Sequence, residues 1–118
     1  MGKLTIDNRT MLPKGLNSET QIAVTNAIRD LEKADIEVDK NCGIREGFYV
    51  LIDKEKALLS AYIDGDYKTV VDMYDELYAG FNELMHVASY STIDYILREM
   101  HNIRIAYAVS KVMVDKAA

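Results

Sequence analysis

The chain has little of the residues that build covalent or strongly kinked frameworks. Its 118 residues include one cysteine, one proline and no tryptophan. The single cysteine, Cys42, cannot form a disulfide within the chain, so a reducing compartment is expected. The longest run of aliphatic and aromatic residues is Phe48–Ile52, whereas a membrane-spanning helix needs about 20. The first residues lack the charged-then-apolar pattern of a secretion signal. We therefore expect a cytoplasmic protein with no membrane partner.

Positive charge is also scarce. The chain has 14 Lys and Arg residues against 19 Asp and Glu residues, which gives a net charge of −5. A nucleic-acid-binding protein needs a basic surface to neutralise phosphates, and no Lys/Arg-rich run is present. We therefore expect no nucleic-acid partner. The 49% of apolar and 28% of charged residues indicate a folded globular domain and not a disordered chain.

Familiar catalytic patterns are absent from the sequence. There is no Gly-rich phosphate loop, no Gly-x-Ser-x-Gly, no Cys-x-x-Cys and no His-Glu-x-x-His. Glu83 and His86 form a Glu-x-x-His pair, but ferritin-like sites use two such pairs and further glutamates. Cys42 has no evident base beside it in the sequence. We therefore expect no enzymatic activity, no metal site and no cofactor.

Residues 1–16 differ from the rest of the chain. Leu4 and Ile6 alternate with polar residues, which is compatible with a short strand at 3–7. We expect an extended N-terminal arm over 1–16, followed by a single helical domain over 17–118. The apolar side chains of the arm need to be buried on the chain's own bundle or on a neighbouring subunit: Leu4, Ile6, Met11 and Leu12.

Apolar residues at helical spacing predict a mainly α fold, a small bundle of three to four helices. The expected helices span about 18–33, 54–63, 67–88 and 92–115. Ser18 and Gln21 have capping-box spacing at the start of the first helix, and Ile22 belongs to its apolar row. Asp53 and Asp66 are expected to cap the second and third helices. The segment 44–52 is left open, because a short strand at 47–52 and an earlier start of the helix both fit.

A short stretch around the turn at 64–66 has a familiar pattern. Ala61-Tyr62, Gly65-Asp66-Tyr67, Val70, Tyr74 and Leu77 resemble the middle of a tetratricopeptide repeat. No second copy follows at the expected period, and repeat arrays need about three copies for stability. The resemblance therefore implies one antiparallel helical hairpin and not membership of that family.

The last expected helix is apolar on two sides. One row runs through Ile93, Ile96, Met100 and Ile103, and a second row lies about 160° from Ile103 at roughly 100° per residue. We call this second row the outer stripe; it consists of Ile105, Val109 and Val112. A small bundle buries one side of such a helix, so the outer stripe is expected to be a subunit interface. The alternative is that the N-terminal arm covers it.

A cationic row also follows the last helix. Arg98, His101 and Arg104 are three residues apart, with Tyr95 nearby, and such a row can bind a phosphate or a carboxylate. The alternative is a solvated face with intrahelical ion pairs.

These patterns favour a non-enzymatic interaction or assembly subunit that forms homo-oligomers through its C-terminal helix and its arm. Small proteins of phages and mobile elements often have this make-up, although this is an analogy of architecture. The alternative is a small protein that binds an anionic metabolite or nucleotide through the cationic row.

Overall fold

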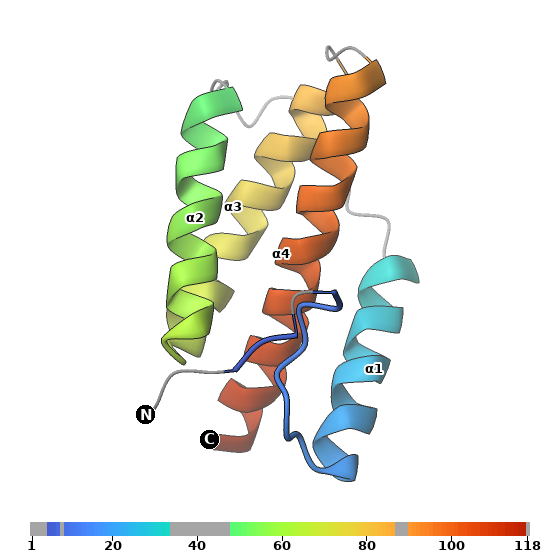
Figure 1. Ribbon diagram of the computed structural model, residues 1–118, viewed down its shortest axis with the longest axis vertical. Coiled ribbons are helices and arrows are strands. Elements are labelled where there is room, and N and C mark those ends of the chain that lie inside the picture. The colour runs from blue at the N-terminus through green and yellow to red at the C-terminus, as the bar shows by residue number, and fades with distance from the viewer. Residues whose placement is uncertain (1–4, 8, 34–47, 87–89, 118) are drawn as a thin grey trace.

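The computed structural model describes residues 5–7, 9–33, 48–86 and 90–117. Within these ranges the helices are α1 (Ser18–Lys33), α2 (Phe48–Ile63), α3 (Tyr67–Met85) and α4 (Tyr90–Ala117). α2, α3 and α4 run side by side with α3 antiparallel to the other two, and α1 lies across α4 from α2 (Figure 1). The predicted helical bundle is therefore confirmed. In the described part of the chain, no helix has the length and apolar character needed to cross a lipid bilayer.

α2 and α3 form the helical hairpin that the turn predicted. Gly65 has a φ angle of 78°, a left-handed conformation that glycine adopts without a steric penalty. The carboxylate of Asp66 accepts hydrogen bonds from the backbone N–H of Thr69 at 3.4 Å and from its hydroxyl at 2.7 Å. Asp66 therefore caps α3, as expected, because it satisfies one of the unpaired amides of the first turn.

The main core lies between α2, α3 and α4. A row of apolar residues at helical spacing on α3 is buried, and its members are at most 1% exposed: Val70, Tyr74, Leu77 and Phe81. It meets buried side chains of the two neighbouring helices: Leu51, Leu58, Tyr62, Ile96, Met100 and Ile103. Burial of these apolar surfaces is the main source of stability for the three helices.

Gly80 allows α2 to approach α3 closely. A Cβ atom at this position would lie 2.6 Å from Cδ2 of Leu51, and Leu51 is itself only 1% exposed. A buried leucine has little room to move away because protein interiors are close-packed. The glycine is therefore required by packing.

α2 begins at Phe48, earlier in the chain than the expected helix over 54–63. A strand at 47–52 is wrong for the described residues 48–52, which are helical, and Asp53 lies inside the helix instead of capping it. The β-branched and aromatic residues of this segment favour strands weakly, but packing overrides such a preference. Here Leu51 enters the core and Ile52 packs against it.

The start of α1 also differs in detail. Asn17, and not Ser18, is the N-cap, because its side-chain oxygen accepts the backbone N–H of Thr20 at 2.8 Å. Gln21 reaches back to the carbonyl oxygen of Leu16 at 3.2 Å. Ile22, expected in the apolar row, is 62% exposed. The row is centred on Val24 instead, which is 2% exposed.

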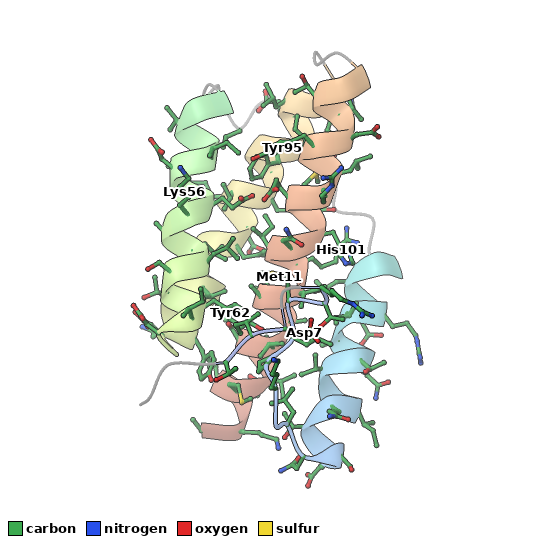
Figure 2. All side chains as sticks on the ribbon, viewed as in Figure 1. Asp7, Met11, Lys56, Tyr62, Tyr95 and His101 are labelled. Carbon is green, nitrogen blue, oxygen red and sulfur yellow. The ribbon has the colours of Figure 1, made fainter. Side chains whose placement is uncertain are left out.

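The N-terminal arm doubles back on itself instead of staying extended. Ile6 pairs with Pro13 in an isolated antiparallel bridge. The described part of 3–7 therefore forms one bridge instead of the expected short strand. The N–H of Asp7 donates to the carbonyl of Leu12 at 3.0 Å. Met11 turns the chain with a φ angle of 63°. The hydroxyl of Tyr62 donates to the Met11 carbonyl at 2.9 Å, and Figure 2 shows these two residues facing each other in front of α4.

We expect Gly80→Ala to lower the free energy of unfolding by about 1–3 kcal/mol, the usual cost of overpacking a core. Urea denaturation measures this change. In a Leu51→Ala background the added methyl group has space, so the same substitution should become neutral or stabilising by roughly 0.5–1 kcal/mol through helix propensity. Equal destabilisation in both backgrounds would show that the contact with Leu51 is not the cause.

Candidate functional site

The outer stripe of α4 is buried inside the chain. Ile105, Val109 and Val112 are 5%, 0% and 9% exposed. Within the single chain they are therefore covered, and their role as a subunit interface stays a prediction. The physical reason is that α1 packs along α4, so the chain provides the second partner that a helix with two apolar sides requires.

The arm contributes to the same cover. Ile6, Met11 and Leu12 are half-buried and pack against the core, and the arm crosses in front of α4 toward α1 (Figure 1). Leu4, the fourth predicted arm residue, lies outside the described residues. In the single chain, the cover of α4 therefore comes from α1, with the arm packed beside it. We call residues 5–33, the arm together with α1, the N-terminal segment.

The N-terminal segment is attached mainly to one helix. Among the described residues, α1 packs against α4 and against no other helix. Val24 is the one apolar residue of α1 that is fully buried. At the ends of the two helices, the ammonium group of Lys116 donates a hydrogen bond to the hydroxyl of Thr20. The segment therefore lies on the surface of the bundle and does not complete its centre.

The cationic row is not brought to one place. Arg98 and His101 are exposed, whereas the guanidinium group of Arg104 turns to α3 and donates to the hydroxyl of Tyr78 at 2.6 Å. Tyr95 is nine residues before Arg104 and so lies about 180° away around the helix, where the charges of Glu99 and Glu55 act on it. The four predicted ligand-binding residues therefore do not converge.

Arg104 belongs to a cluster of tyrosines that links α3 to α4. Tyr74 stacks on Tyr107 with ring centroids 4.1 Å apart, and the Arg104 guanidinium carbon lies 5.5 Å from the centroid of the Tyr78 ring. Burial raises the pKa of Tyr74 to about 12, and the charge of Arg104 opposes this rise. A neutral, buried aromatic group beside an arginine stabilises a helix interface through stacking and cation–π attraction.

Sequence reasoning missed a pair of carboxyl groups between α2 and α4. Glu55 is 5% exposed, and its Oε2 atom is buried without a hydrogen-bond partner among the described residues. The pKa of Glu55 is raised to about 9, chiefly by burial and in addition by the nearby Glu99 on α4. A signal was present in the sequence, because Glu55 occupies the core row formed by Leu51, Leu58 and Tyr62 at helical spacing.

The Glu-x-x-His pair, Glu83 and His86, lies at the end of α3. Glu83 is half-buried near the end of α3, while His86 is exposed and follows the last residue of that helix. In the ranges that the structure describes, no group of three or more His, Cys, Asp and Glu side chains lies close enough to hold a metal ion. Cys42 lies outside the described residues.

We expect Arg104→Ala to lower the free energy of unfolding by about 1–2 kcal/mol, because it leaves the Tyr78 hydroxyl without its charged donor. Arg98→Ala, a matched change on the exposed side of the same helix, should stay within about 0.5 kcal/mol. Guanidinium denaturation of both variants checks this difference. Similar values for the two arginines would contradict a structural role for Arg104.

Comparisons with family models, with curated proteins and with solved structures give no match for this chain. The function is therefore inferred from the geometry of the chain itself, in which the strongest feature is the outer stripe of α4 under the N-terminal segment.

Proposed function

We propose that this chain is a non-enzymatic assembly protein that joins copies of itself by exchanging its N-terminal segment, residues 5–33. In this arrangement the arm and α1 of one copy pack on α4 of a neighbouring copy. The observation that carries the proposal is that, among the described helices, α1 packs against α4 alone.

The contact surface has the properties of a helix-binding site. The outer stripe is apolar and continuous along α4, and an amphipathic helix fills it, which is a common mode of protein recognition. A neighbouring copy carries the same helix and the same stripe. Domain exchange recreates the contacts of the closed chain in trans, so it has a low energetic cost.

The N-terminal segment is also the part of the chain that can leave with least disruption. Most of the buried core residues belong to α2, α3 and α4, and α1 contributes only Val24 to them among its described residues. The arm residues that face the core are half-buried, and Met11 adopts a left-handed backbone conformation that costs a non-glycine residue about 1–2 kcal/mol. Release of the segment therefore exposes the outer stripe while the main core stays intact.

Cross-linking can distinguish exchange between copies from packing within one copy. Thr20 and Lys116 are hydrogen-bonded across α1 and α4, so Thr20→Cys and Lys116→Cys place two thiols on facing helices. The native Cys42 is replaced by serine. The protein is incubated at high concentration, diluted and treated at once with a short bismaleimide, and denaturing gel electrophoresis then separates the products.

We expect covalent dimers or larger species whose yield rises with the protein concentration during incubation, because the two thiols then belong to different copies. The variants with Thr20→Cys alone and Lys116→Cys alone are the matched controls for random collisions, and circular dichroism checks that each is folded. Internally cross-linked monomers at every concentration would overturn the proposal.

A further inference from the structure

The turn between α2 and α3 faces the last turns of α4 across an open cleft. Both lie at the lower end of the bundle in Figure 1. The cleft has a volume of about 720 Å³ and is lined by residues 65–68 on one side and by the end of α4, from Met113 to Ala117, on the other. Binding sites for small molecules usually have volumes of about 300–1,000 Å³. The cleft is therefore large enough to hold one.

The side of the cleft formed by α4 is mainly apolar. Met113, Val114 and Ala117 line it, and Met113 is half-buried because it also packs against the core. The unbranched thioether side chain of methionine adapts its shape to an irregular neighbour. A ligand that covers this wall removes apolar surface from water, which is favourable. The wall therefore suits an aliphatic group.

The cleft also carries positive charge. Lys68 on α3 and Lys116 on α4 both line it and are exposed. Neither lysine forms an ion pair with another residue that the structure describes. One carboxylate lines the cleft, that of Asp66, and it already accepts two hydrogen bonds from Thr69. Two ammonium groups against one carboxylate attract an anion, although the whole chain has a net charge of −5.

Two side chains of the cleft have hydrogen-bond donors to offer. The ammonium group of Lys116 has three N–H bonds, and the hydroxyl of Thr20 accepts one of them. This contact restricts the long lysine side chain and lowers the entropic cost of a further contact with a ligand. Burial raises the pKa of the Tyr67 hydroxyl, so this group stays protonated at neutral pH and can donate a hydrogen bond.

We propose that this cleft binds an amphiphilic carboxylate, a molecule with an aliphatic tail and one anionic head group, such as a medium-chain fatty acid. The tail packs on Met113, Val114 and Ala117, and the carboxylate is held by Lys68 and Lys116. A neutral apolar molecule leaves the two charges unused, and a small anion leaves the apolar wall uncovered. The cleft is formed by α3 and α4 of one chain, so the proposal does not depend on exchange of the N-terminal segment between copies.

The test is an NMR titration of the full nitrogen-15-labelled chain with octanoate at neutral pH. We expect saturating chemical-shift changes at the amides of residues 65–68 and 113–117, because these residues form the cleft. Octanol has the same tail without the charge, and acetate has the same head group without the tail. Neither should reach saturation over the same range of concentration. Equal saturation with octanol or with acetate would overturn the proposal, and so would shifts that do not saturate or that spread over all helices.

Matched lysine substitutions test the contribution of the charge. Lys68→Gln and Lys116→Gln should each raise the Kd for octanoate roughly threefold to fivefold, as expected for the loss of an exposed ionic contact. Lys111→Gln, an exposed change on α4 outside the lining of the cleft, should leave the Kd unchanged. Circular dichroism checks that each variant is folded. The same Kd for the native chain and for Lys68→Gln would overturn the assignment of the head group to these lysines.

Discussion

α4 carries apolar side chains on opposite sides, and both sides have to be removed from water. The inner side, around Ile96 and Ile103, meets α2 and α3 in a core with almost no exposed surface. The outer side, around Val109, is covered by α1, which packs against no other helix in the described part of the chain. The division of the molecule into a closed bundle and a peripheral cover follows from this one helix, because a helix can bury two faces only if it has two partners.

The two contacts of α4 differ in how they are secured. The inner contact is closed by large apolar and aromatic groups and by the guanidinium–tyrosine cluster around Arg104. The outer contact has one fully buried apolar side chain from α1, Val24, and the arm is tied down by the hydrogen bond from Tyr62. Free energies of local opening follow such differences in burial, so the cover is the first part of the chain expected to open.

The sequence predicted the features that depend on local spacing. The bounds of α1, the buried row from Val70 to Phe81 and the cap at Asp66 could all be read from neighbouring residues. The features that it did not predict depend on residues far apart in the chain. The helical start at Phe48 depends on packing against α3. The folding-back of the arm depends on a bridge between Ile6 and Pro13. The approach of Glu99 to Glu55 depends on the meeting of α4 with α2. No local pattern reports such meetings, although an acidic residue within a core row is a usable warning.

The exclusive pairing of α1 with α4 also has a consequence for the order of synthesis. A ribosome makes residues 5–33 before it makes α4. α1 therefore leaves the ribosome before α4, the described helix that it packs against, has been made. α2 and α3 can form their hairpin as soon as they are complete, because their contacts are local. Val24 and the arm stay uncovered until residues 90–117 follow. When several ribosomes translate one messenger RNA, the delay between synthesis of α1 and synthesis of α4 therefore decides which α4 the helix α1 meets first. It can be the α4 of its own chain or that of an adjacent nascent chain.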